Sequence, residues 1–419
     1  MNKIKGKSLY LVLLSALILF FVSDALNKYF QVKYAIDVED GDVFSNTISV
    51  SIYFRFLFEL IFLYRIFINF NKTNAKGIFL LGLLFILFIF GQLIFVANYH
   101  NPNFSLSYQL TLFNKYIFVF IVFYAIRDII NYPYLFDKLM KMLGHLYIAN
   151  SILIFIGAFL NITLLKSYFT QDYRYGFDGL IPAINEATLF YMIGISYFYF
   201  NYINKIQGIF PLLLCGAASM LLGAKAMYLF LFILIIYHIV FRAKLLYKFI
   251  SLGFFVLVIA AAITFLMSQE NAYLYEYFLL KYEDNGLIDA ITSGRSEYVY
   301  TKFVANLDIW SWLNYLIGGT DQLKFMIEMD FFDGFLIFGS IGLVVYLLIY
   351  FKTLFKTLSI KSFRFFFCIS FFLLAFLVGH FFASAMNSLY LNLIVLYFIS
   401  KEEVGKVVQK NNLVLEVHD

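Results

Sequence analysis

Long apolar runs recur along this 419-residue chain, and they constrain its fold more than any other feature. A helix needs about 20 mostly apolar residues to cross the hydrocarbon core of a bilayer. Only helices can cross in large numbers, because each backbone amide must then be bonded within its own segment. The sequence predicts an all-α polytopic membrane protein that forms one transmembrane domain over 1–419. About twelve transmembrane helices are expected, at 8–26, 48–68, 77–97, 111–127, 143–163, 184–203, 208–223, 225–241, 248–267, 331–351, 364–382 and 384–400.

Composition excludes the main alternatives to a membrane protein. Hydrophobic residues make up 63% of the chain and charged residues 14%, whereas soluble domains are about 45–50% apolar and about 25% charged. Cys215 and Cys368 each lie inside an apolar run, which excludes a disulfide scaffold and a thiolate metal site. The net charge of +5 is spread over short loops, so nucleic acid is not an expected partner.

The basic residues predict the orientation of the chain. Of the 31 Lys and Arg residues, 20 lie on the side of the two termini and 10 on the other, with Arg55 inside the second span. Because Lys and Arg are enriched in cytoplasmic loops, both termini are expected in the cytoplasm. Span 8–26 has no small-residue cleavage site behind it and is expected to be an anchor. In 208–241 the turn at Gly223–Lys225 is so short that the two spans could form a re-entrant pair.

One external segment, 268–330, is much longer than the others and carries most of the external charge. Loops of this length usually bear function or contain short helices of their own. The smaller external loop 37–42 holds four acids in six residues, which could bind a divalent cation through hard oxygen ligands. Acidic external loops are common and this one has no convergent partner, so no metal site is predicted.

A third external loop combines a cation with aromatic residues. Tyr173 and Arg174 stand among Tyr, Phe and Gly residues, a composition that presents a cation and ring faces to an anionic or sugar ligand. The alternative is an aromatic belt at the membrane surface with a snorkelling Arg. Asn185 and Glu186 follow in the outer turn of an apolar helix, where polar groups tend to face a cavity.

Two further cations are candidates for binding an anion. Lys225 lies between apolar spans, so it needs an anionic partner or a wet pocket unless it snorkels from a helix end. Arg295 follows Thr292-Ser293-Gly294, a plausible helix start, where backbone amides and a guanidinium would suit a phosphate. An ordinary surface Arg is the alternative for Arg295.

Carboxylates crowd the start of the tenth span. Glu328, Asp330 and Asp333 enter an apolar helix, and acids at a low-dielectric edge can act as general bases. The alternative is that they only complement the dipole of the helix N-terminus. His380 either lines the same cavity or lies at the interface. Arg55 and Glu59 are four residues apart on one face of the second span, which predicts an internal ion pair.

The order of these motifs resembles that of the O-antigen polymerase and O-antigen ligase family of bacterial envelope polysaccharide assembly, most closely the Wzy-type polymerases. The topology is similar over the whole chain, with Phe-, Leu- and Ile-rich spans and one large periplasmic loop late in the sequence. The motifs that carry the resemblance are Arg174-Tyr-Gly176-Phe with Pro182 and Asn185, Leu222-Gly223-Ala224-Lys225, Ser293-Gly294-Arg295, Gly318-Gly319, and Glu328-Met-Asp330-Phe-Phe-Asp333 followed by Gly339 and Gly342.

Two positions depart from the pattern of the family. Lys225 stands where the family carries the Arg of a Ser-Arg pair, and Glu328 stands at the usual His position. Ligases of the family depend on that His, so its replacement favours a polymerase. It also leaves open whether Glu328 or Asp330 is the base.

The resemblance implies a metal-independent, inverting glycosyltransferase of the GT-C type in the bacterial inner membrane, without a cofactor. It would polymerise oligosaccharide units linked to undecaprenyl pyrophosphate at the periplasmic face, with membrane lipid and a chain-length regulator protein as further partners. Fixed cations would stabilise the pyrophosphate leaving group, and a carboxylate would deprotonate the acceptor sugar. The implied residues are Arg174, Lys225 and Arg295 for pyrophosphate, Glu328 and Asp330 for catalysis, and Tyr173, Asn185, Glu186, Asp333 and His380 for substrate binding.

A transporter, such as a flippase for lipid-linked oligosaccharides, is the rival from another class. Transporters tend to place charges near the membrane midplane and to consist of two similar halves. In this sequence the unusual charges gather at one membrane face, and no internal repeat is found. The expectation is therefore a polymerase, with a ligase and a transporter as alternatives.

Overall fold

The computed structural model describes residues 2–36, 50–70, 72–99, 101–102, 104–169, 175–242, 295–355, 362–377, 379 and 381–416. The described residues form helices and turns, with one isolated bridge between Lys166 and Phe177. The predicted all-α class is confirmed. The main helices are α1 (Asn2–Ile36), α2 (Val50–Ile68), α3 (Lys72–Asn98), α4 (Leu106–Ile126), α5 (Pro133–Leu160), α6 (Ile184–Ile203), α7 (Phe210–Met220), α8 (Lys225–Phe241), α15 (Asp330–Thr353), α16 (Phe363–Leu377) and α17 (Ala385–Glu416).

Every predicted span coincides with one of these helices except 248–267, which lies outside the described residues. Within the described residues, five helices are long and apolar enough to cross a membrane, at Lys5–Tyr34, Ala75–Asn98, Leu106–Asn131, Pro133–Leu160 and Asp330–Thr353. Large apolar side chains stand exposed on the helices, as lipid-facing residues would, among them Phe67, Phe79 and Phe159. These features support a multi-pass membrane protein.

The pair α7 and α8 is shorter than the other spans. Helix α7 has 11 residues, so at a rise of 1.5 Å per residue it is about 17 Å long. The hydrocarbon core is about 30 Å thick, so α7 alone is too short to cross it. Gly223, with φ of 73°, makes the turn between α7 and α8, as the short turn in the sequence indicated.

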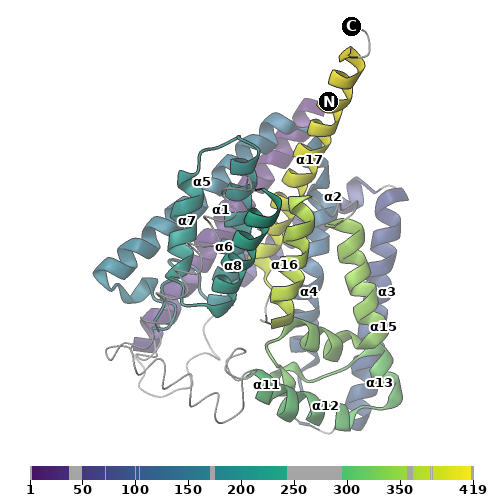
Figure 1. The fold of residues 1–419 in the computed structure, drawn as a ribbon. Coiled ribbons are helices and arrows are strands. Elements are labelled where there is room, and N and C mark those ends of the chain that lie inside the picture. The colour runs from purple at the N-terminus through teal and green to yellow at the C-terminus, as the bar shows by residue number, and fades with distance from the viewer. Residues whose placement is uncertain are drawn as a thin grey trace.

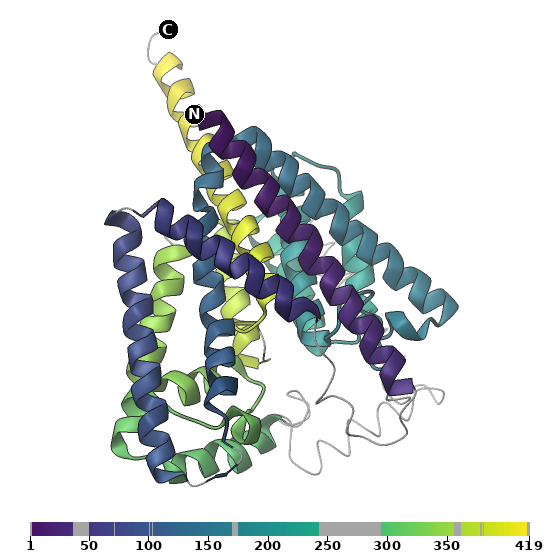
Figure 2. The same ribbon diagram turned by 180° about the vertical axis from the view of Figure 1, so that it is seen from behind.

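The two termini lie at one end of the bundle, and the short helices of segment 295–329 lie at the other (Figures 1 and 2). Helix α17 is central, since it touches α1, α4, α5 and α6. Two ion pairs join neighbouring elements: Lys401 pairs with Asp137 at 2.8 Å, and Arg364 pairs with Glu402 at 3.3 Å. The orientation predicted from the Lys and Arg residues stays a prediction.

The long external segment contains short helices of its own, as its length predicted. They are α11 (Arg295–Tyr298), a π-helical turn (Val299–Phe303), α12 (Val304–Ile309), α13 (Trp312–Ile317) and α14 (Gln322–Phe325). Residues 268–294 of this segment lie outside the described residues. The single-domain organisation remains a prediction.

Helix α13 packs against α3 and α15 at a break in α15. Gly339 interrupts α15 with a φ of 64° and a ψ of −173°. The backbone N–H of Gly319 donates to Leu336 O at 2.9 Å, and the Asn314 side chain donates to Gly91 O at 3.2 Å. Backbone groups that a membrane helix frees at a break need partners of this kind. The contact fixes the external segment on the outer half of α15, next to the candidate site.

Candidate functional site

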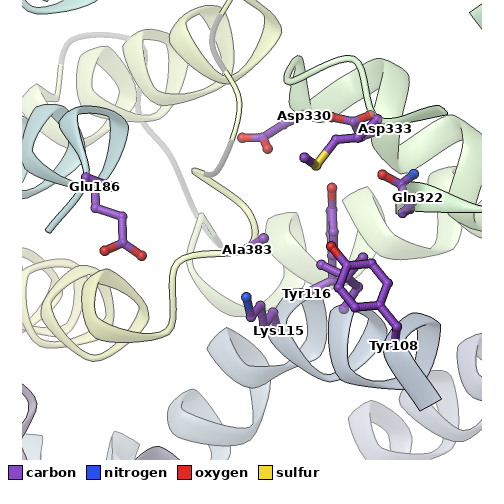
Figure 3. Close-up of a pocket in the computed structure, with 11 residues that line it drawn as sticks. Tyr108, Lys115, Tyr116, Glu186, Gln322, Asp330, Asp333 and Ala383 are labelled. Carbon is purple, nitrogen blue, oxygen red and sulfur yellow. The ribbon is translucent and has the colours of Figure 1, made fainter. Parts of the chain in front are cut away.

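A cavity of about 220 Å³, lined by charged and apolar side chains, lies beside the short helices of segment 295–329, at the end of the bundle away from the termini (Figures 1 and 3). Its walls come from α4, the start of α6, the segment around α14, the start of α15 and the loop before α17. Three carboxylates and one ammonium group line it together with two tyrosines. The lining residues are Tyr108, Leu112, Lys115, Tyr116, Ala183, Glu186, Gln322, Met326, Asp330, Asp333 and Ala383.

Two carboxylates of the cavity also tie its walls together. Asp330 Oδ2 accepts hydrogen bonds from the backbone N–H groups of Phe381 at 2.7 Å and Phe382 at 3.1 Å. Asp333 Oδ1 accepts from the backbone N–H of Ile327 at 2.8 Å. Both side chains are buried, with Asp330 at 1% exposed. The start of α15 therefore fixes the loop before it and the loop before α17.

Glu186 and Lys115 bring charge to the cavity from two other helices. Glu186 lies in the first turn of α6, where its Oε1 is 3.4 Å from Ser384 Oγ. Lys115 lies within α4 and faces the cavity (Figure 3). Glu186 interacts electrostatically with Lys115 and with Arg55. A line of half-buried charged groups thus extends from the cavity toward α2.

The predicted ion pair between Arg55 and Glu59 is wrong. Arg55 Nη2 instead pairs with Asp24 Oδ1 on α1 at 2.8 Å. Glu59 Oε2 accepts a hydrogen bond from Asn114 Nδ2 on α4 at 2.8 Å. Both neighbouring helices pack directly on α2 and offer a partner, so the two side chains of α2 turn to different helices.

Glu328 and Arg295 form an ion pair near the cavity but are not among its lining residues, with Arg295 Nη2 3.4 Å from Glu328 Oε2. Glu328 has a φ of 64°, a left-handed conformation that is rare for a residue other than glycine. An added Cβ at Gly379 would lie 2.6 Å from Glu328 C, so the backbones are in close contact there. The Glu328 side chain is 41% exposed, which makes it far more accessible than Asp330.

Lys225 lies at the start of α8, next to the loop that carries Arg174 in the sequence. The backbone N–H of Phe177 donates to Leu221 O at 2.7 Å, and Gly223 packs against Tyr175 O. The structure thus brings the Gly176 motif against the turn before Lys225. Lys225 is exposed and does not line the cavity.

A buried ion pair anchors the loop before α6. The Lys28 ammonium of α1 pairs with the Asp178 carboxylate and donates to Gly179 O at 2.7 Å. Asn150 of α5 donates to Asp178 O at 3.1 Å and accepts from the Leu180 N–H at 2.9 Å. Lys28, Asp178 and Asn150 are each at most 1% exposed. This anchor holds the segment that leads into Glu186.

The predicted site residues that the structure describes do not all meet in one place. Glu186, Asp330 and Asp333 line the cavity, Arg295 pairs with Glu328, and Lys225 lies by the Gly176 loop. Asn185 is half-buried and is not a lining residue. Tyr173, Arg174 and His380, like the acids at 37–42, lie outside the described residues. Lys225 and Arg295 do not line the cavity that holds Glu186, Asp330 and Asp333, so the structure does not bring these cations and carboxylates into one pocket.

Sequence reasoning missed four polar lining residues: Lys115, Tyr108, Tyr116 and Gln322. A signal existed for Lys115, because an ionisable residue inside the predicted span 111–127 is a functional candidate by default. No such signal marks the two tyrosines in a chain with 33 of them, or Gln322 in a long external segment.

No metal centre is evident in the described part of the chain, where no group of three or more His, Cys, Asp or Glu side chains could hold an ion. Asp330 and Asp333 both come from the start of α15, and Glu186 lies on the opposite side of the cavity (Figure 3). Comparisons of the chain with protein-family models, with curated proteins and with solved structures found no match.

Proposed function

We propose that this protein is a membrane glycosyltransferase of the O-antigen polymerase type. In this proposal about twelve helices of a GT-C-like fold cross the bacterial inner membrane, with both termini in the cytoplasm and the cavity facing the periplasm. The substrates are oligosaccharide units linked to undecaprenyl pyrophosphate. The observation that carries the proposal is the accessible Glu328 carboxylate, paired with Arg295 beside a polar cavity at the end away from the basic termini.

Glu328 is the carboxylate best placed to act as the base. Its side chain is accessible, whereas one oxygen of buried Asp330 already binds two backbone N–H groups. In the proposed step an acceptor hydroxyl oxygen attacks the anomeric carbon, and its proton passes to the carboxylate. The bond from that carbon to the pyrophosphate oxygen breaks, and the displacement inverts the anomeric centre.

Arg295 stabilises the leaving pyrophosphate in this proposal, since it lies beside Glu328. Lys225 lies at the loop that follows Arg174 and does not line the cavity, so its proposed role in binding pyrophosphate rests on the resemblance to the family. Positive groups fixed before the reaction stabilise developing charge without reorganisation. These side chains supply that stabilisation without a metal ion.

The test is a polysaccharide ladder from cells in which the variants Arg295→Ala and Lys225→Ala replace the native protein. Long chains should be lost while each variant stays in the membrane at the native level. Arg242→Ala is the matched control, because Arg242 ends α8 at the other end from Lys225 and should leave the ladder unchanged. Normal ladders in both test variants would refute the role of these cations.

A transporter is the second candidate, since Asp24, Arg55, Glu186 and Lys115 place charge within the helices and α15 is broken at Gly339. Charges and broken helices inside a bundle are typical of transport pathways. Proteoliposomes separate the two functions. A transporter moves the lipid-linked oligosaccharide between leaflets at constant length, whereas a polymerase lengthens it. A ligase would pass it to a different lipid acceptor.

A further inference from the structure

We infer that the polar cavity is a subsite for one pyranose ring without an acidic group, with Lys115 and Gln322 as donors to the ring's oxygen atoms. The inference rests on the proposed function for the choice of a sugar. It assigns a binding role to side chains that sequence reasoning did not select, and it limits the class of repeat unit that the enzyme can take.

One unsatisfied donor beside a charged donor suits the cavity to a ligand with acceptor oxygens. Gln322 is 2% exposed, and its Nε2 has no hydrogen-bond partner among the described residues. Its backbone is held in place, because the Gln322 N–H donates to Gln109 Oε1 at 3.4 Å. Half-buried Lys115 faces the same space and brings an ammonium group that interacts electrostatically with Glu186. Buried polar groups in native proteins nearly always have partners.

The size of the cavity fits one sugar ring. Its volume is about 220 Å³, which is the liquid volume of roughly seven water molecules at about 30 Å³ each. Pockets for drug-sized ligands begin at about 300 Å³. An oligosaccharide would have to extend out of the cavity, with a single ring inside.

One wall supplies the apolar surface that a ring needs. Tyr108, Leu112, Lys115 and Tyr116 project from one face of α4, since side chains three, four and eight residues apart share a helix face. The C–H face of a pyranose can pack on such tyrosine rings while its hydroxyls meet the polar walls. An acyl chain does not fit, because it would leave the polar groups of the other walls unpaired.

The charges of the cavity select against an acidic sugar. Glu186, Asp330 and Asp333 bring three carboxylates, and Lys115 brings one ammonium. Carboxylate oxygens accept hydrogen bonds from hydroxyl groups. A uronic acid would add a further carboxylate beside Glu186 and Asp330, whereas Lys115 alone among the lining residues offers a positive charge. A ring bearing only hydroxyl or amide groups meets no such penalty.

The experiment measures binding of methyl glycosides to the full-length protein in lipid nanodiscs by saturation-transfer NMR. Methyl β-glucopyranoside should bind saturably, and methyl β-glucuronide at least about tenfold more weakly. Gln322→Leu and Lys115→Met should each weaken binding of the glucoside at least about tenfold. The matched control is Gln92→Leu, because Gln92 is also a buried amide without a partner among the described residues but does not line the cavity.

Equal binding of the two glycosides, or no binding of either, would overturn the inference. So would Gln322→Leu and Lys115→Met variants that bind as the Gln92→Leu control does. If a variant fails to fold, the comparison of the two glycosides on the native protein still decides. The binding assay does not depend on glycosyl transfer, so the two proposals can fail separately. A protein that prefers the glucoside to the glucuronide but never elongates lipid-linked oligosaccharide refutes the proposed function alone. A protein that elongates the oligosaccharide but binds both glycosides equally refutes the subsite alone.

Discussion

Lys28→Met should destabilise the protein sharply, because it leaves the Asp178 carboxylate buried without its cation. Both side chains are 1% exposed, Lys28 pairs with Asp178 Oδ1, and Asp178 Oδ2 has no hydrogen-bond partner among the described residues. Removing one partner of a buried ion pair costs about 3–5 kcal/mol. The entropy of unfolding is about 2.1 cal/mol/K per residue, so for the 419 residues of this chain the melting temperature should fall by about 3–6 °C.

The chain carries its own reporter for this experiment. Cys215 and Cys368 are free and buried, so a thiol-reactive fluorophore labels them only as the protein unfolds. Lys401→Met is the matched control, since Lys401 and Asp137 are 29% and 43% exposed, and exposed pairs contribute about 0–1 kcal/mol. The double variant Lys28→Met with Asp178→Asn should regain part of the loss. A Lys28→Met protein that melts with the native one would refute the role of the anchor.

Two further predictions concern the backbone. Glu328→Gly should keep or raise the melting temperature, because glycine adopts a left-handed φ without strain, yet it should abolish elongation. The control Lys205→Gly, also at a residue with positive φ, should keep its activity. Full activity in Glu328→Gly would contradict the assignment of Glu328 as the base. Gly319→Ala should lower the yield of folded protein measured by fluorescence-detected size-exclusion chromatography, since the new Cβ would lie 2.3 Å from Gly91 O. The control Gly82→Ala should give the native yield, because no atom lies within 4 Å of its new Cβ.

Hydropathy predicted the helices well, because the length of a membrane helix is set by the bilayer and not by its neighbours. For α7 and α8, the short turn between them was the one sequence feature that set the pair apart from the other predicted spans. The Arg55–Glu59 error shows where local reasoning ends: spacing within one helix says nothing of Asp24 and Asn114, which compete for these side chains from other helices.

The site was predictable only in part for the same reason. Glu186, Asp330 and Asp333 stood out as acids at the edges of apolar spans, and they line one cavity. Lys115 completes that cavity through the packing of α4 against distant segments. The strain at Glu328 follows from its close contact with Gly379, which no sequence pattern reports.

The most direct test of the central claim is elongation of lipid-linked repeat units by the purified protein in the presence of a chelator. The native protein should build a ladder of products, and Glu328→Gln should build none. Glu59→Gln is the control, since Glu59 is a membrane carboxylate bound to Asn114 outside the cavity, and it should elongate normally. A ladder of native length from Glu328→Gln, or strict dependence of the native protein on added divalent cation, would contradict the account.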